Sequence, residues 1–267
     1  MCRLVGWVSD RPRTLSDVLG PIAVERFAEL STVHANGWGA AWSPAPGASV
    51  EIRRSMLEAD TDPDFADFAT TTAATSAVVH LRLATPGMGY TIEDNHPFRD
   101  GAWTMAHNGA ILPAAATGGL MRADSTRTPR GGTDSERYFY ALRDEMDRDG
   151  VNLPEAVGRV VARMAEAGLQ ALSLNAMLLE PGALHVVSCH DPDRQPVGVQ
   201  VWPSRDVSPP PYFDVWWTEK PGIVVAASSG IVESSSQWRP MSPSTVLSVD
   251  SDTLGVTVDP IGRVLTG

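Results

Sequence analysis

The chain has 267 residues and a formal net charge of −11, with 43% hydrophobic and 20% charged residues. This composition is ordinary for a soluble globular protein, and the acidic balance excludes the basic face that nucleic-acid phosphates require. No apolar run approaches the length that spans a bilayer, and charged residues interrupt any signal-peptide pattern at the N-terminus. We therefore expect a cytoplasmic protein that binds neither nucleic acid nor a membrane.

The chain alternates between segments typical of strands and a smaller number typical of helices. β-branched and aromatic content predicts strands over Arg3–Val8, Gly39–Trp42, Val50–Arg53, Ala77–Ala84, Trp103–His107, Leu172–Leu179, Leu184–Cys189, Phe213–Thr218, Ile223–Ala227, Thr245–Val249 and Gly255–Val258. Apolar periodicity and capping residues predict helices over Ser16–Leu30, Pro63–Thr72, Ser135–Met146 and Leu153–Ala167. Many strands with a few helices indicate sheets covered by helices, in one domain over residues 1–267.

Two stretches interrupt this pattern. Pro113–Gly132 is rich in glycine, threonine and arginine, and Asp191–Pro211 is rich in proline. Most such loops are surface connections, but the first lies between two motifs described below and could be a mobile lid.

Cys2 directly follows the initiator methionine. Removal of Met1 would leave a thiol and a free α-amino group on one residue, which are the two parts of an N-terminal nucleophile. Taken alone, Cys2 is more simply the start of a buried strand. Neither Cys2 nor Cys189 has a second cysteine or a histidine at ligand spacing, so we expect no metal and no other cofactor.

Arg82 and Asn108-Gly109 are the next residues that could take part in binding or catalysis. Arg82 interrupts an apolar strand, where a guanidinium needs an anionic partner, either a protein carboxylate or that of a substrate. Asn108-Gly109 is most simply a hairpin turn. Alternatively, the Asn108 amide and the Gly109 N–H could form an oxyanion hole.

Asp134 and Gly37-Trp38-Gly39 also allow two interpretations. Asp134 is most simply a helix N-cap, or else a ligand for a substrate ammonium. The glycines beside Trp38 form a tight bend or let the backbone approach a ligand closely. The positions of His80 and His107 relative to Cys2 cannot be read from the sequence, so a Cys–His pair stays open.

Together and in this order, these motifs resemble the class II glutamine amidotransferases, a branch of the N-terminal-nucleophile hydrolases. The motifs that carry the resemblance are the Met1-Cys2 start, Arg82-x-Ala84-Thr85-x-Gly87, Asn95-His96-Pro97-Phe98, His107-Asn108-Gly109 and Thr133-Asp134-Ser135-Glu136. The chain departs from the family at Ser228-Ser229-Gly230, where a Ser-Glu-Pro sequence is usual.

The resemblance implies a four-layer αββα sandwich and a role for each motif. Cys2 would be the nucleophile with its amine as base, and Asn108 and Gly109 would hold the oxyanion. The substrate-binding residues would be Arg82, Thr85, Asp134, Gly37 and Trp38, with Arg82 on the α-carboxylate and Asp134 on the α-ammonium.

The implied reaction cleaves a γ-glutamyl amide through a γ-glutamyl thioester. Among free-standing members, the chain is most similar to the type that removes glutamate from γ-glutamyl intermediates in ergothioneine biosynthesis. Three other interpretations stay open: a glutaminase subunit that supplies ammonia to a separate synthase, a non-catalytic binding module on the same fold, and, least favoured, a thiol redox protein that uses Cys2 and Cys189.

Overall fold

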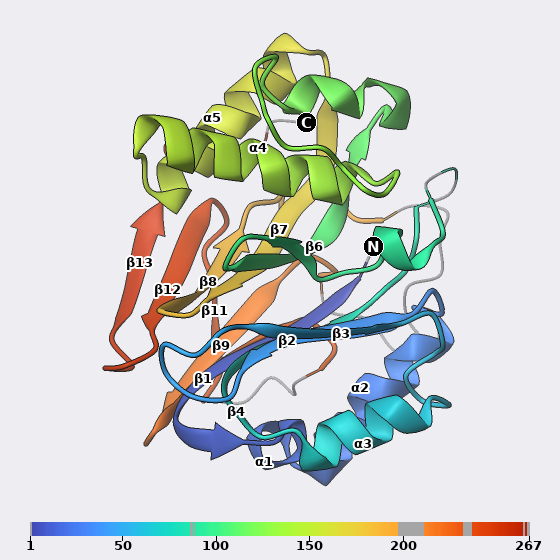
Figure 1. Ribbon diagram of the computed structural model, residues 1–267, viewed down its shortest axis with the longest axis vertical. Coiled ribbons are helices and arrows are strands. Elements are labelled where there is room, and N and C mark those ends of the chain that lie inside the picture. Colours follow the sequence, from blue (N-terminus) through green and yellow to red (C-terminus); the bar gives the residue numbers. More distant parts are fainter. Residues whose placement is uncertain are drawn as a thin grey trace.

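The computed structural model describes residues 2–85, 87, 89–196, 211–231, 237–263 and 265. Within these ranges the strands form two antiparallel sheets that pack face to face (Figure 1). The first sheet has the order β11 (Arg239–Pro240), β9 (Val215–Lys220), β10 (Ile223–Ser228), β1 (Arg3–Arg13), β4 (Ala74–Leu81), β2 (Trp38–Ser43) and β3 (Glu51–Ser55). The second has the order β13 (Val256–Pro260), β12 (Thr245–Asp250), β8 (Ala183–Ser188), β7 (Gln170–Glu180), β6 (Trp103–Leu112) and β5 (Phe98–Asp100).

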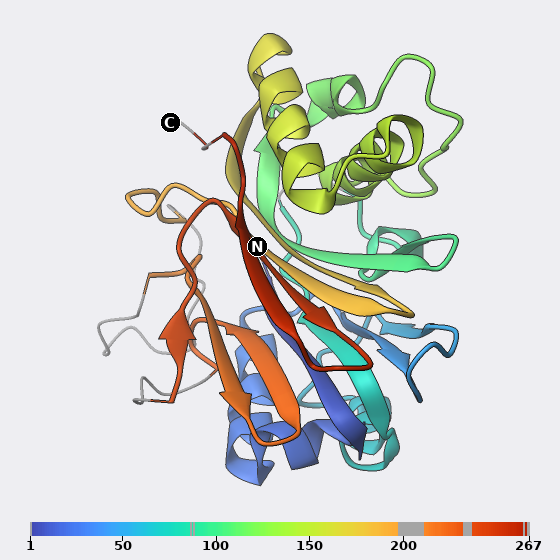
Figure 2. The ribbon, with the colours of Figure 1, turned by 90° about the vertical axis from the view of Figure 1, so that its left-hand side faces the viewer.

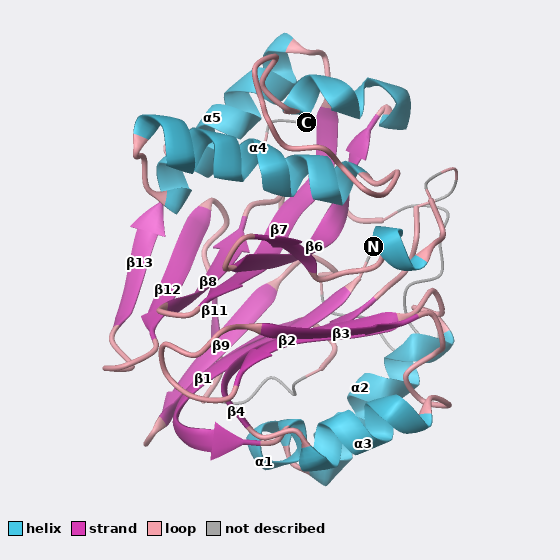
Figure 3. Cartoon of the chain, viewed as in Figure 1, coloured by secondary structure: helices cyan, strands magenta, loops and turns pink. Residues whose placement is uncertain are grey.

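Helices cover the outer face of each sheet. The first sheet carries α1 (Leu15–Leu19), α2 (Pro21–Glu29) and α3 (Pro63–Thr71), and the second carries α4 (Asp134–Asp149) and α5 (Leu153–Glu166). Short 3₁₀ turns are η1 (Leu30–Thr32), η2 (Ile92–Asp94) and η3 (Ala114–Leu120). The side view in Figure 2 and the colouring in Figure 3 both show strands between two helical layers. The predicted αββα sandwich is therefore confirmed. None of the helices in the described ranges is long and apolar enough to cross a membrane.

Among the described residues, three large apolar clusters and a small fourth one around Tyr212 and Phe213 hold the four layers together. The alternation of side chains along a strand divides β1 between two of these clusters, because successive residues point to opposite faces. Val5 and Trp7 pack toward α1–α3, whereas Leu4 and Val8 pack between the sheets. Gly6 lies on the inter-sheet face, where an added Cβ would stand 2.9 Å from the Met177 sulfur. The absence of a side chain at Gly6 thus lets the second sheet pack closely against β1, the strand that follows Cys2.

All eleven predicted strands are present, with shifted ends. The short strands β5 and β11 were not predicted, since three and two residues carry little periodic signal. The single helix predicted over Ser16–Leu30 is wrong. Gly20 adopts a φ of +82° and separates α1 from α2, and Pro21 begins α2. Proline favours the first turn of a helix because it has no N–H to donate there, and it disrupts a helix interior.

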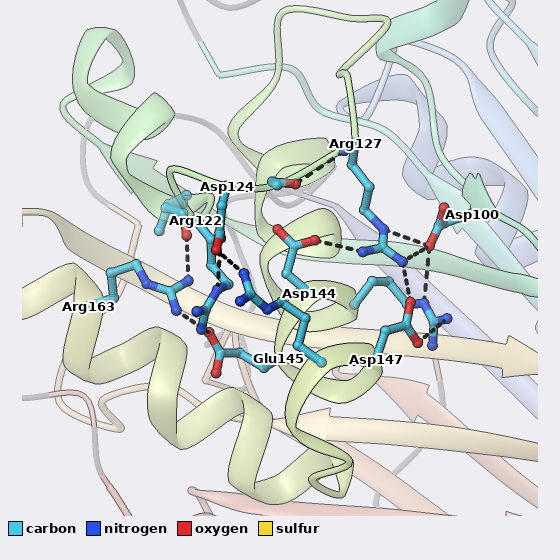
Figure 4. A network of polar contacts seen from close by, with 12 residues as sticks. Asp100, Arg122, Asp124, Arg127, Asp144, Glu145, Asp147 and Arg163 are labelled. Carbon is cyan, nitrogen blue, oxygen red and sulfur yellow. Dashed lines mark hydrogen bonds and ion pairs between the residues drawn. The ribbon is translucent and has the colours of Figure 1, made fainter.

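The stretch Pro113–Gly132 contains η3 and then runs against α4 on a network of arginines and carboxylates (Figure 4). Arg127 donates to Asp100 at 2.9 Å and to Asp144 at 2.6 Å, and it also pairs with Asp147. Glu145, buried on α4, pairs with Arg122, Arg159 and Arg163. The network therefore ties this stretch to β5, α4 and α5. Most of the other predicted excursion, Asp191–Pro211, lies outside the described residues.

Candidate active site

Cys2 lies directly before β1 and is 4% exposed. Its backbone nitrogen donates to the Asn108 side-chain oxygen at 2.7 Å, across the interface between the two sheets. Its sulfur lies 4.0 Å from the carbonyl oxygen of Leu83. The nitrogen that would become the free α-amine is thus held by the second sheet, while the thiol faces the segment after β4.

Opposing effects act on the Cys2 thiol. Burial raises its pKa, but the positive amino terminus of the unprocessed chain, His80 and the Leu83 contact together outweigh burial and lower the pKa to about 6. Cys189 is also buried but has no such charges beside it, and burial raises the pKa of its thiol to about 12. Since the thiolate is the reactive form, Cys2 has the electrostatic setting of a nucleophile and Cys189 that of a core residue.

Arg82 lies one residue after the end of β4, so its prediction as a residue inside the strand is wrong. The strand is shifted because β4 pairs with β1 from Ala74 onward. Arg82 is 2% exposed, and one terminal nitrogen donates to the Gly89 carbonyl at 2.6 Å. The other, Nη1, is buried and has no hydrogen-bond partner among the described residues. A buried guanidinium nitrogen without an acceptor is costly, and a carboxylate would accept from both nitrogens.

Asn108 and Gly109 lie inside β6, so the predicted hairpin turn is wrong. They pair with Asn175 and Leu174 of β7, and the strand continues to Leu112. A Cβ on Gly109 would lie 1.9 Å from the Ser173 carbonyl oxygen, so close strand approach, not a turn, explains the glycine.

Asp134 is the first residue of α4, and the N-cap is Thr133, whose hydroxyl accepts from the Glu136 nitrogen at 3.3 Å. The prediction of Asp134 as the N-cap is therefore wrong by one residue. Its carboxylate instead accepts from the Ile111 nitrogen at 2.6 Å and the Ser135 nitrogen at 2.8 Å. These bonds fix a buried carboxylate between β6 and α4, and a carboxylate retains further lone pairs for another donor.

A small cavity brings most of the predicted residues together. Its volume is about 20 Å³, and it is lined by Cys2, Arg82, Leu83, Ala84, Thr85, His96, Gly109, Thr133, Asp134 and Ser135. A thiol, a guanidinium and a carboxylate from distant parts of the chain thus converge on one space. Among the described residues, no group of three or more histidine, cysteine or carboxylate side chains could hold a metal ion.

A family model for the class II glutamine amidotransferases matches residues 1–193. The chain belongs to this family. Two curated relatives are similar to part of the chain. The gamma-glutamyl-hercynylcysteine sulfoxide hydrolase of Mycobacterium tuberculosis strain H37Rv is 33% identical over 125 residues, 43% of this chain and 53% of that protein. That of Mycolicibacterium smegmatis is 34% identical over 119 residues, 42% of this chain and 52% of that protein. The aligned part is about half the length of these relatives.

Two solved structures share the fold over nearly the whole chain. A class II domain protein from Silicibacter pomeroyi has a TM-score of 0.60 at 17% identity, covering 98% of this chain and 100% of that one. The glutamine phosphoribosylpyrophosphate amidotransferase of B. subtilis has a TM-score of 0.61 at 13% identity, covering 99% of this chain and 50% of that one. At such identities the likeness concerns the fold alone.

Gly37 and Trp38 do not line the cavity. The Trp38 side chain is fully buried in the core beneath the first sheet, where its indole N–H donates to Asp62 at 2.8 Å and its ring packs on Phe65. Gly37, at a φ of +108°, accepts from the Arg82 nitrogen at 2.8 Å through its carbonyl. The structure thus gives Trp38 a packing position and Gly37 a place behind Arg82, and no substrate contact is proposed for either.

Sequence reasoning left the histidines unplaced. His80 and His96 are buried with ring centroids 4.3 Å apart, and none of their ring nitrogens has a hydrogen-bond partner among the described residues. His96 lines the cavity, and burial lowers its pKa well below the ordinary value. His107 instead contacts the Ser135 hydroxyl at 2.9 Å and the Ser173 carbonyl at 3.1 Å. The signals that could have placed them near the site were the spacing of His80 two residues before Arg82 and the positions of His96 and His107 inside the motifs of the resemblance.

Proposed function

We propose that this class II glutamine amidotransferase hydrolyses a γ-glutamyl amide, with Cys2 as the nucleophile after removal of Met1. The observation that carries the proposal is the convergence, in one cavity, of a thiol with a lowered pKa, a buried arginine with an unpaired Nη1 and a buried carboxylate. A glutamyl group presents the matching chemistry: a carbonyl for the thiolate, an α-carboxylate for the guanidinium and an α-ammonium for the carboxylate.

The proposed reaction has two halves. The Cys2 thiol transfers its proton to the free α-amine, and the sulfur attacks the γ-carbonyl carbon. The negative charge on the carbonyl oxygen is stabilised by the Asn108 amide and the Gly109 N–H. Collapse of the tetrahedral intermediate breaks the C–N bond of the substrate. The leaving group departs as an amine after it takes the proton from the Cys2 α-ammonium, and a γ-glutamyl thioester remains. Water then adds to the thioester, the C–S bond breaks, and glutamate and the free thiol are released.

Asn108 has a second task in this scheme. Its side-chain oxygen already accepts from the Cys2 nitrogen at 2.7 Å. Since an amide carries its acceptor and its donors at opposite ends, the oxygen can orient the amine while the NH₂ group faces the oxyanion. One side chain would then hold both the base and the developing charge.

Substrate entry requires the walls of the cavity to move. A volume of about 20 Å³ accommodates roughly one water molecule, whereas a glutamyl group is several times larger. The Gly89 carbonyl occupies one donor of Arg82 at 2.6 Å. A substrate carboxylate would replace this neutral acceptor with a charged one, so we propose that binding displaces the Gly89 carbonyl from Arg82.

The leaving group is proposed from the relatives. Their names describe hydrolysis of γ-glutamyl-hercynylcysteine sulfoxide. We therefore propose a leaving group larger than ammonia, with delivery of ammonia to a separate synthase as the alternative.

Intact mass spectrometry tests the proposal first. The purified protein is weighed before and after incubation with a glutamine-analogue diazoketone, and glutamate release is assayed from γ-glutamyl-hercynylcysteine sulfoxide and from glutamine. We expect loss of Met1, one adduct on Cys2, and release from the sulfoxide substrate. Cys2→Ala must abolish both adduct and turnover, whereas Cys189→Ala must retain them. Release from glutamine alone would favour the ammonia-supplying alternative. Retained Met1 with no adduct would refute the hydrolase and favour a binding module.

A further inference from the structure

Tyr212 reaches the nucleophile from a part of the chain that the family match does not include. The match ends at residue 193, and Tyr212 lies 210 residues from Cys2 in the sequence. Its side chain is 1% exposed, and its hydroxyl donates to the Cys2 carbonyl oxygen at 3.2 Å. The same hydroxyl lies 3.0 Å from the Nε2 atom of His34.

The ring and the main-chain carbonyl of Tyr212 both contact Arg3, the residue after Cys2. The Arg3 guanidinium lies over the Tyr212 ring, 3.7 Å from its centroid, and donates to the Tyr212 carbonyl at 3.1 Å. The Ser229 hydroxyl donates to the same carbonyl at 2.9 Å, and the Tyr212 nitrogen donates to the Gln195 side chain at 2.7 Å. Tyr212 is therefore itself fixed on several sides. Ser229 belongs to the Ser228-Ser229-Gly230 sequence, in which this chain departs from the family pattern.

We propose that Tyr212, oriented by His34, is a positioning residue that anchors the main chain of Cys2. Asn108 holds the nitrogen of Cys2 and Tyr212 holds its carbonyl, so both ends of the residue are tied and only the thiol is left to rotate. The anchor gains importance when Met1 is removed, because Cys2 then becomes a chain terminus, and termini fray unless they are tied down.

The protonation states suit this role. The Leu30 carbonyl lies 2.7 Å from His34 Nδ1 and can only accept, so Nδ1 carries the ring proton and Nε2 is an acceptor. Burial, with the Arg3 charge, lowers the pKa of His34 well below its ordinary value, so the ring stays neutral. Burial raises the pKa of Tyr212, so the phenol keeps its proton. That proton is shared between the Cys2 carbonyl and His34.

Tyr212→Phe tests the anchor, because it removes the hydroxyl and keeps the ring beneath Arg3. Tyr138→Phe is the matched control, since Tyr138 is also fully buried and donates to a main-chain carbonyl, that of Leu174, at 3.3 Å. The first readout is independent of activity: the rate at which an aminopeptidase removes Cys2, followed by intact mass. We expect removal to be at least ~10-fold faster in Tyr212→Phe than in wild type and Tyr138→Phe, since the terminus opens locally.

The second readout rests on the proposed function. We expect kcat for the γ-glutamyl substrate to fall by ~10–100-fold in Tyr212→Phe with KM unchanged, because a displacement of about 1 Å at the reacting atom has costs of this order. His34→Asn keeps a donor for Leu30 but removes the Nε2 atom that fixes the position of the Tyr212 hydroxyl. The hydroxyl is then held from one side only, so this variant should produce a smaller change of the same kind. If Tyr212→Phe does not fold, this variant decides the question.

The two readouts separate the failure of the anchor from the failure of the proposed function. Absence of turnover in the wild-type protein would refute the function, and the aminopeptidase result would still test the anchor. Wild-type removal rates in both Tyr212→Phe and His34→Asn would overturn the anchor. Equal acceleration in Tyr138→Phe would also overturn it, because the effect would then reflect general destabilisation.

Discussion

The pH dependence of Cys2 alkylation tests the electrostatic setting of the proposed nucleophile. In the unprocessed chain the positive amino terminus and His80 outweigh burial and lower the thiol pKa to about 6, whereas an ordinary thiol has a value of 9.0. Removal of Met1 places the α-ammonium on Cys2 itself, where it favours the thiolate in the same direction. Cys189 provides an internal contrast, because burial raises its pKa to about 12. We therefore expect iodoacetamide to label one cysteine of the native protein, with a rate that rises through pH 6 and is flat above neutrality.

The shape of the profile is more informative than the rate. At pH 7 a thiol of pKa 6 is about 90% ionised and a thiol of pKa 9 about 1%, a difference of ~90-fold. The lower basicity also weakens the thiolate as a nucleophile, by ~20-fold for a Brønsted coefficient of about 0.4–0.5. The net advantage at pH 7 is thus only ~4-fold. The midpoint of the pH profile, by contrast, differs by the full separation of the two pKa values.

The assay follows adduct formation on the native protein by intact mass from pH 5 to about 9.5. This range brackets the lowered pKa of Cys2 and the pKa of an ordinary thiol. Cys2→Ala must lose the labelling, which assigns it to Cys2. His80→Gln removes the imidazole that favours the Cys2 thiolate, so its profile should move to higher pH. A wild-type midpoint near that of an ordinary thiol, or a profile unaffected by His80→Gln, would refute the reasoning.

Four further substitutions test single contacts. Arg82→Met should raise KM for the γ-glutamyl substrate by ~10–100-fold with little change in kcat, since charge-assisted hydrogen bonds contribute ~1.5–3 kcal/mol. An unchanged KM in steady-state kinetics would remove Arg82 from the site. Asn108→Ala should lower kcat by ~10²–10³-fold, and a normal kcat with a lowered Tm would assign it a structural role instead. Asp134→Asn should weaken binding of glutamyl substrates but not of analogues without the α-amine, as competition assays would show. Glu145→Gln should destabilise the fold by ~1–3 kcal/mol without changing kcat, because its arginine partners are partly exposed; an unchanged Tm would contradict the importance of the network.

Strands were predicted better than helix boundaries because their signals differ in range. A buried strand is marked along its whole length by β-branched residues, and all eleven predicted strands are present. The error at Ser16–Leu30 arose because apolar periodicity continues through Gly20 and Pro21, although the backbone turns there. Proline at the first helical position and glycine at positive φ are helix-boundary signals, and they outweigh the periodicity.

The error at Asn108-Gly109 has a different cause. Locally, this dipeptide is the strongest hairpin signal, and the sequence shows nothing that opposes a turn. In the structure the glycine is required by the Ser173 carbonyl, and the Asn108 side chain is oriented by the nitrogen of Cys2. Both partners lie far away in the sequence, so nothing near the dipeptide could show that it lies inside a strand. The family resemblance, in which the dipeptide is part of the His107-Asn108-Gly109 motif, favoured the oxyanion role, which stays a proposal.

Tyr212 shows where such reasoning ends. The resemblance grouped eight residues, and five of them line the cavity: Cys2, Arg82, Thr85, Gly109 and Asp134. The other three, Asn108, Gly37 and Trp38, are not among its lining residues. Tyr212 belongs to no motif and follows a proline-rich stretch, yet its hydroxyl donates a hydrogen bond to the main-chain carbonyl of Cys2, the proposed nucleophile. A family motif records the residues that the shared chemistry requires, whereas the residues that hold the nucleophile in place depend on how each chain closes around it. A search for chain-specific control of this site should therefore start from the contacts of the Cys2 main chain, which only the folded structure reveals.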